Sequence, residues 1–230
     1  MTAEELVSRL GEPGLRVVDA RFELTEPDAG SALYVAGHVP GAVYLDLDRD
    51  LADPPGDRGR HPLPDPTALA AKLGARGVGD EHEVVVYDQT GTMYAARAWW
   101  LLRYLGHDRV RFLDGGYRAY LAAGGPVSTD PARHEPATFT ARPRGDMVVD
   151  AEELLGRLDD PRLVLLDARG PERYRGEVEP IDAVAGHIPG ALNRPYMRGM
   201  GEEGLLPPAE LRAVHRVDEL PPDADVVAYC

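Results

Sequence analysis

The chain has 230 residues, 43% of them apolar, which is enough for one large domain or two modest ones with ordinary cores. A net charge of -14 without a basic cluster argues against a nucleic-acid partner, and no apolar run reaches the roughly 18 residues of a membrane helix. With one Cys there is no intrachain disulfide, and the first residues do not form a signal peptide. We expect a soluble cytoplasmic protein that binds neither nucleic acid nor membrane.

The first part of the chain alternates short helices with apolar strands. Periodicity and turn residues predict, in order, a helix over 3–10, a strand over 15–19, an irregular polar segment, a short apolar run over 43–45, a loop over 46–66, a helix over about 67–73, a strand over 84–88, a helix over 95–105, a strand over 110–114 and a helix over 117–123. Strands that alternate with helices predict an α/β domain built on a parallel sheet flanked by helices.

The same plan begins again after a Pro-rich segment. We assign 1–124 to a first domain, 125–146 to a linker and 147–230 to a second domain, with a helix over 151–158 and strands over 163–167 and 226–230. Asp167-Ala168-Arg169 repeats Asp19-Ala20-Arg21, and the run from Gly186 to Ala191 repeats the run from Gly37 to Ala42. Landmarks in the same order indicate a duplication, so the sequence predicts tandem α/β domains.

The single cysteine, Cys230, stands at the carboxyl end of the last predicted strand. The matching strand of the first copy ends in Asp88 instead. Ligand sites of open α/β sheets lie at this edge, so Cys230 is a candidate nucleophile; a buried structural thiol is the alternative. A thiol with a pKa of about 8.5 needs nearby groups that stabilise its thiolate, such as backbone N–H groups.

The second copy is shorter than the first. About 37 residues follow Asp88 before the linker and supply a helix, a strand and a further helix, whereas nothing follows Cys230. A parallel sheet without these elements would expose apolar faces and unpaired backbone groups. We expect that the second domain lacks its C-terminal elements here, that the 230 residues belong to a longer chain, and that the groups stabilising the thiolate lie beyond Cys230.

Taken together, the motifs resemble the rhodanese superfamily, specifically its two-domain thiosulfate and 3-mercaptopyruvate sulfurtransferases. The motifs that carry the resemblance are Asp19-Ala20-Arg21, Gly37 to Ala42, Tyr87-Asp88, Ala96-Arg97-Ala98-Trp99-Trp100, Leu113-Asp114-Gly115-Gly116, Asp167-Ala168-Arg169, Arg173-Tyr174, Glu179-Pro180, Gly186 to Ala191 and Val226 to Cys230. The resemblance implies tandem rhodanese-like domains, an inactive first one and a catalytic second one. It implies a small anionic sulfur donor and a thiol or cyanide acceptor.

The resemblance also implies roles for individual residues. Cys230 would take the outer sulfur of the donor as a persulfide and pass it to the acceptor. Arg173 would hold the anionic end of the donor, with Arg175 as a second candidate; the alternative for such an Arg is a surface ion pair with Glu172 or Glu177. From the first domain, Phe22 and Tyr94 match positions that wall the active-site cleft, and core packing is the alternative for both.

Some features of the sequence bear on the substrate. Mercaptopyruvate enzymes of this family commonly have a second substrate Arg after a Glu-Pro pair, whereas Ile181-Asp182 follows Glu179-Pro180 here. This departure favours thiosulfate over 3-mercaptopyruvate. The competing hypotheses are a phosphatase of the same superfamily and a non-catalytic binding protein.

The other polar motifs are interpreted as structural. His38 and His187 each precede a residue and Pro-Gly, where a ring nitrogen can fix a turn by bonding to the backbone, and each Asp-Ala-Arg motif predicts a local pair at a strand end. Asp88 is interpreted as a solvated strand end. No Cys/His cluster has zinc spacing and no phosphate-binding glycine loop is present, so neither a metal nor a cofactor is expected.

Overall fold

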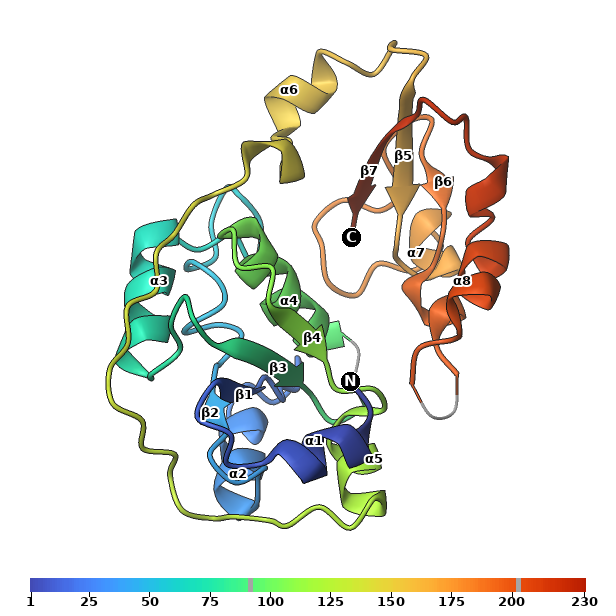
Figure 1. Ribbon diagram of the computed structural model, residues 1–230. Coiled ribbons are helices and arrows are strands. Elements are labelled where there is room, and N and C mark those ends of the chain that lie inside the picture. Colours follow the sequence, from blue (N-terminus) through green and yellow to red (C-terminus); the bar gives the residue numbers. More distant parts are fainter. Residues whose placement is uncertain (91–92, 202–203) are drawn as a thin grey trace. The chain divides into compact units, whose positions relative to one another are not determined.

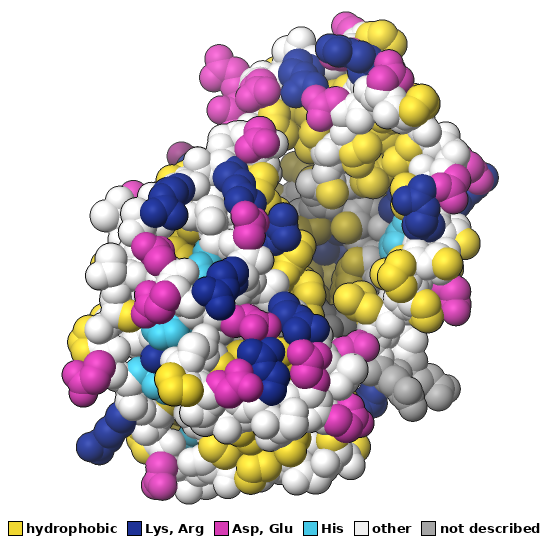
Figure 2. All heavy atoms as spheres, viewed as in Figure 1, with side chains coloured by type: hydrophobic (Ala, Val, Ile, Leu, Met, Phe, Trp, Pro, Cys, Tyr) yellow, Lys and Arg dark blue, Asp and Glu magenta, His cyan; other side chains and the backbone are white. Residues whose placement is uncertain are grey.

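The computed structural model describes residues 1–90, 93–201 and 204–230. It divides into two compact units, Met1–Gly145 and Asp146–Cys230, and each has its own parallel sheet (Figure 1). Acidic and basic side chains are interspersed over the face shown in Figure 2 and do not gather into one basic patch. No helix in the described part of the chain is long and apolar enough to cross a membrane.

The first unit is a four-stranded parallel sheet in the order β2-β1-β3-β4, with helices on both faces (Figure 1). Its strands are β1 (Leu15–Asp19), β2 (Val43–Tyr44), β3 (Glu83–Tyr87) and β4 (Val110–Phe112). Its helices are α1 (Ala3–Arg9), α2 (Ala29–Ala36), α3 (Pro66–Ala75), α4 (Met93–Tyr104) and α5 (Gly116–Ala122). The predicted α/β class is confirmed, and β1 has the predicted bounds.

Both faces of this sheet are apolar, which explains why its strands are continuous apolar runs. Successive residues of β3 point to opposite faces. Val84 and Val86 belong to one buried cluster with residues of α3 and α4, and Val85 and Tyr87 belong to the other with residues of α1 and α5. The central strand is therefore covered on both sides.

Helix α2 lies where the sequence predicted an irregular segment. Its apolar side chains give no clear signal because Leu33 is 41% and Val35 is 67% exposed. Close packing stabilises the helix instead: a Cβ on Gly30 would lie 2.1 Å from the carbonyl oxygen of Arg21. The Tyr34 hydroxyl also donates to the carbonyl oxygen of Ala42 at 2.8 Å. These contacts are made with residues outside the helix, eight and nine positions away, so the helical periodicity of 29–36 does not show them.

The segment 125–145 lies along the first unit as extended chain. Ser128 forms an antiparallel bridge with His38, and the backbone N–H of Ala137 donates to Gly74 at 2.9 Å. The ring of Phe139 is 8% exposed and belongs to the first core cluster. Of the residues interpreted as a linker, only the last one, residue 146, falls in the second unit.

The second unit has a three-stranded parallel sheet in the order β6-β5-β7. Its strands are β5 (Leu163–Asp167), β6 (Leu192–Asn193) and β7 (Asp225–Tyr229), and its α-helices are α6 (Ala151–Leu155), α7 (Pro171–Tyr174) and α8 (Pro208–Val214). The 3-10 turns are η1 (Gly145–Met147), η2 (Tyr196–Gly199) and η3 (Val217–Glu219). β5 matches its predicted bounds, whereas α6 ends at Leu155, earlier than predicted, with Gly156 as its C-cap residue.

The predicted strand at the end of the chain is present, but it is not buried. β7 pairs with β5 in parallel register along its whole length. Its side chains are exposed or half-buried, with Val226 46% exposed. In the described residues, no strand pairs with its other edge. The apolar pattern therefore predicted the strand and not the exposure of its side chains.

Candidate functional site

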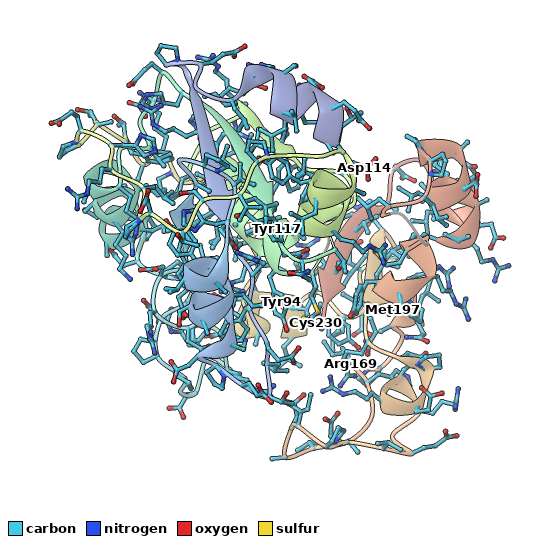
Figure 3. The ribbon with its side chains drawn as sticks, turned by 90° about the horizontal axis from the view of Figure 1, so that it is seen from below. Tyr94, Asp114, Tyr117, Arg169, Met197 and Cys230 are labelled. Atoms are coloured by element: carbon cyan, nitrogen blue, oxygen red, sulfur yellow. The ribbon has the colours of Figure 1, made fainter. Side chains whose placement is uncertain are left out.

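Cys230 directly follows β7, at the carboxyl edge of the second sheet. The parallel register sets Tyr229 beside Asp167, and the backbone N–H of Ala168 donates to the carbonyl oxygen of Tyr229 at 2.9 Å. The thiol therefore stands where two neighbouring strands end (Figure 3), and it is exposed. The catalytic role of Cys230 stays a prediction.

The neighbouring strand ends in a charged pair that fixes the loop beside Cys230. Arg169 donates from Nη2 to Asp167 Oδ2 at 2.6 Å and from Nε to Oδ1 at 3.1 Å. Its Nη2 also donates to the carbonyl oxygen of Gly186. Burial alone would raise the pKa of Asp167, but hydrogen bonds from Arg169 and Tyr229 hold that pKa below its usual value. The predicted strand-end pairing is confirmed.

The first unit contains the same arrangement. Arg21 donates to Asp19 Oδ2 at 2.6 Å and to the carbonyl oxygen of Gly37 at 2.7 Å. Asp19 is fully buried and the Arg21 side chain is 2% exposed. In both copies the motif joins a strand end to the following Gly-His turn. These residues therefore have a structural role in each copy.

Both histidines of the repeated Gly-His motif fix a turn, as predicted. His187 Nδ1 lies 2.6 Å from the carbonyl oxygen of Tyr174, and the two rings stack with centroids 3.7 Å apart. His38 makes the same contacts with Tyr34, at 2.7 and 3.8 Å. In the second unit this pairing connects the end of α7 to the turn that precedes β6.

Arg173 on α7 lies between two carboxylates. Its Nε donates to Glu179 Oε2 at 3.0 Å, and its Nη2 lies 2.9 Å from Glu179 Oε1 and 2.6 Å from Asp182 Oδ2. These are not the partners, Glu172 or Glu177, that the ion-pair alternative named. The loop after α7 folds back over the helix, so residues six and nine positions further on reach the guanidinium.

Glu179 is the centre of this cluster. Its side chain is 5% exposed, and its Oε1 accepts the backbone N–H groups of Ile181 and Asp182 at 3.1 and 3.0 Å. Hydrogen bonds from Arg173 and from the Asp182 backbone lower the pKa of Glu179 to about 2. Sequence analysis used Glu179 only as part of a motif and missed its role in orienting Arg173.

Arg175, the second candidate for the donor, is in a different environment. Its Nε and Nη2 donate to the two carboxylate oxygens of Glu177, each at 2.7 Å. Both side chains are about half exposed, at 50% and 54%. This is a surface ion pair of the kind that the alternative describes.

Asp88, the counterpart of Cys230 in the first copy, is not solvated as predicted. It is 2% exposed. Its Oδ1 accepts the backbone N–H of Thr90 at 2.9 Å, and its Oδ2 accepts those of Tyr94 and Ala95 at 3.0 and 3.1 Å. The N–H groups of the turn and the first turn of α4 therefore surround a negative charge. A strand-end Asp shortly before a helix is a capping signal that could have indicated this.

Phe22 and Tyr94 contact each other in the first unit. Their rings meet edge to face with centroids 5.4 Å apart. Phe22 is 6% exposed and belongs to the first core cluster, against which the half-buried Tyr94 packs. The packing alternative describes these contacts, and a role in walling the active site stays a prediction for both.

In the described residues, no group of His, Cys, Asp and Glu side chains could hold a metal ion.

Comparison with known proteins adds to this geometry. Residues 2–123 and 150–230 match the family model of the rhodanese-like domain. A probable 3-mercaptopyruvate sulfurtransferase of Pseudomonas aeruginosa is 46% identical, covering 100% of this chain and 83% of that protein. The thiosulfate sulfurtransferase of Bos taurus is 36% identical over 95% of this chain and 75% of its own length.

A solved structure shows the same architecture. The crystal structure of SseA from Escherichia coli, described as a 3-mercaptopyruvate sulfotransferase, is similar with a TM-score of 0.88 at 29% identity. The match covers 100% of this chain and 87% of that one. The tandem repeat inferred from the duplicated motifs therefore corresponds to a known fold with parallel sheets flanked by helices.

Proposed function

This chain belongs to the rhodanese-like domain family, and we propose that it is a sulfurtransferase that carries sulfane sulfur on Cys230. The observation that carries the proposal is the contrast between the copies. At the carboxyl end of equivalent strands, one has an exposed thiol, and the other has a buried carboxylate surrounded by backbone N–H groups. A strand end that accommodates an anion in one copy is a fitting place for a thiolate in the other.

The proposed reaction has two displacement steps. The Cys230 thiolate attacks the outer sulfur of thiosulfate, the S–S bond of the donor breaks, and its electron pair leaves with sulfite. The outer sulfur remains bound to Cys230 Sγ as a persulfide. A thiolate or cyanide then attacks this sulfur, and the electron pair of the bond that breaks returns to Cys230 as a thiolate.

Arg173 is proposed to hold the anionic end of the donor. A guanidinium offers a planar set of donors that matches an oxyanion, and Glu179 already fixes its direction through Nε. Arg175 is retained as a second candidate, and its exposed pairing with Glu177 gives it the lower rank.

We propose thiosulfate as the preferred donor because apolar Ile181 follows the Glu-Pro pair where the mercaptopyruvate enzymes have a second Arg. The names of the relatives include both donors and so do not select one. They favour neither the phosphatase nor the non-catalytic hypothesis.

The cytoplasm stays the expected compartment.

Mass spectrometry tests the proposal directly. The protein is treated with thiosulfate or with 3-mercaptopyruvate and digested, and the peptide that contains Cys230 is expected to gain one sulfur. The Cys230→Ser variant should gain none, and cyanide should remove the sulfur from the native protein and yield thiocyanate. An unmodified Cys230 with both donors would overturn the proposal.

A further inference from the structure

We propose that Tyr229 is a positioning residue for Cys230, and that its hydroxyl joins the end of β7 to the turn that holds the Arg173 helix. This inference rests on the proposed roles of Cys230 and Arg173. Tyr229 is the last residue of β7 and directly precedes Cys230. Its hydroxyl accepts the backbone N–H of Ile188 at 3.0 Å and is hydrogen-bonded to the carboxylate of Asp167. One side chain therefore connects the end of β7 to the end of β5 and to the turn before β6.

The main chain of Tyr229 is held as well as its side chain. Its carbonyl oxygen accepts the backbone N–H of Ala168 at 2.9 Å, and Tyr229 is paired with Asp167 in the register of β5 and β7. The peptide group that follows is planar, so the φ and χ1 angles of Cys230 are the torsions that then direct the sulfur. Contacts that fix Tyr229 therefore fix the starting direction of the Cys230 side chain.

The first unit contains the same arrangement at the equivalent place. The Tyr87 hydroxyl donates to Asp19 Oδ2 at 2.6 Å and accepts the backbone N–H of Val39 at 3.3 Å. In both units the guanidinium carbon of the Asp-Ala-Arg motif lies 5.8 Å from the centroid of the Tyr ring. The residue after Tyr87 is Asp88, whose carboxylate accepts backbone N–H groups. The arrangement thus precedes an oriented anion in one copy and the proposed nucleophile in the other.

A series of direct contacts continues from Tyr229 to Arg173. Ile188, which donates to the Tyr229 hydroxyl, follows His187 in the chain. The His187 ring stacks on the ring of Tyr174 with centroids 3.7 Å apart, and Tyr174 follows Arg173 on α7. The nucleophile and the guanidinium are therefore attached to the same turn. Attack on a donor held by Arg173 requires a defined distance and direction between them, and a displacement of about 1 Å can lower the rate greatly.

The test compares Tyr229→Phe with a matched control, Tyr87→Phe. Each change removes one hydroxyl from the same arrangement and leaves the ring, but Tyr87 precedes Asp88 and not the thiol. Because Cys230 is the single Cys of the chain, a nitroxide spin label attached to a thiol marks this residue alone. The electron paramagnetic resonance spectrum of the label reports the mobility of Cys230 without any sulfur transfer. In the unlabelled proteins, sulfite release in a single turnover with thiosulfate reports the chemical step.

We expect the label to be more mobile in Tyr229→Phe than in the native protein. The single-turnover rate at saturating thiosulfate should fall about tenfold, while the half-saturating concentration changes less than about twofold. Tyr87→Phe should match the native protein in both measurements. Unchanged label mobility in Tyr229→Phe would overturn the inference. An equal fall in rate in both variants would also overturn it, since the hydroxyl would then contribute only to stability.

A further variant restores the hydrogen-bonding group. With 4-aminophenylalanine at position 229, the amino group can donate to Asp167 in place of the hydroxyl, and we expect label mobility and rate between those of Tyr229→Phe and the native protein. Circular dichroism at the assay temperature shows whether each variant is folded. If Tyr229→Phe does not fold, the 4-aminophenylalanine variant decides the question, and native mobility and rate in it would count against the inference.

The outcome for the inference is separate from the outcome for the proposed function. If Cys230 of the native protein gains no sulfur from either donor, the sulfurtransferase proposal fails, and the label still decides whether Tyr229 fixes Cys230. If Cys230 gains sulfur and the label is equally mobile in all variants, the function stands and the inference fails.

Discussion

The ring of His187 stacks on the ring of Tyr174 with centroids 3.7 Å apart, and its Nδ1 lies 2.6 Å from the carbonyl oxygen of the same Tyr. The Tyr174 hydroxyl in turn donates to the carbonyl oxygen of Ala191 at 2.8 Å. Because Tyr174 directly follows Arg173, these contacts fix the end of the four-residue helix that presents the guanidinium. A helix this short has little stability of its own and depends on such contacts.

Replacement of His187 by Ala should therefore weaken donor binding. The change removes a stacked ring and a hydrogen bond that hold the end of α7. The orientation of the Arg173 side chain on this helix should then be less well fixed. We expect the KM for thiosulfate to rise several-fold, roughly 3- to 10-fold, while kcat changes less. His61→Ala, which removes a ring paired with Asp48 in the first unit, is the control. Equal effects of both changes would contradict the assigned role.

Arg173 and Arg175 should differ in their contributions to donor binding. Replacement of Arg173 by Lys keeps the positive charge but removes the planar donor set, and we expect the KM for thiosulfate to rise about tenfold. The same replacement at Arg175 should have a smaller effect, because that side chain is exposed and paired with Glu177. Steady-state kinetics of both variants gives the comparison, and a larger effect at Arg175 would reverse the ranking.

Asp88 should stabilise the first unit. Asp88→Ala leaves the buried N–H groups of Tyr94 and Ala95 without their acceptor, and we expect a loss of about 2–3 kcal/mol in the free energy of unfolding. Both tryptophans of the chain lie in α4, so their fluorescence during urea unfolding reports this unit. Asp114→Ala, at an exposed strand end, is the matched control. A loss no larger than that of the control would show that the N–H groups find other acceptors.

The buried pair of Arg21 and Asp19 should be more sensitive. Arg21→Leu leaves a fully buried carboxylate without its cation, and we expect a loss of about 3–5 kcal/mol, measured by the same fluorescence. The exposed pair of Arg49 and Asp28 provides the comparison, since Arg49→Leu should change the free energy of unfolding far less. A small effect at both sites would mean that Asp19 is adequately held by its bond from the Tyr87 hydroxyl.

The second unit should lose stability in acid through Glu179. The pKa of this group is lowered from 4.5 to about 2, so the unfolded state binds the proton more readily than the folded state between these values. The stabilisation is complete above about pH 4.5 and disappears as the pH falls to about 2. Calorimetric unfolding across this range should show a weaker pH dependence in Glu179→Gln than in the native protein. Identical profiles would contradict the assignment.

The sequence predicted the sheet strands well and the small helices poorly. β1 and β5 have their predicted bounds because each is an apolar run that ends at an Asp. Helix α8 was missed because it buries no side chain, and α2 because it buries only Gly30. Amphipathic periodicity reports burial, so a helix held by other contacts leaves little trace in the pattern.

Residue order could suggest candidate side chains but not their partners. Local motifs suggested Cys230 and Arg173 as site residues, and the ion-pair alternative for Arg173 named Glu172 or Glu177. The observed partners, Glu179 and Asp182, come from a loop that folds back, and this depends on the backbone bonds that Glu179 accepts. The burial of Asp88 likewise depends on the position of the N–H groups at the start of α4. The sequence alone does not give that position.

The extended segment 125–145 has a practical consequence for anyone who divides this protein for expression. A gene fragment that stops at residue 124 would encode all four strands of the first sheet. It would lack Phe139, which packs in the core, and Ser128, which forms a backbone bridge with His38. Such a fragment is expected to aggregate and to be sensitive to proteases. A fragment that ends after Gly145 would retain the extended segment that packs on the first unit. We therefore expect the better boundary for expression to lie after Gly145 and not directly after α5.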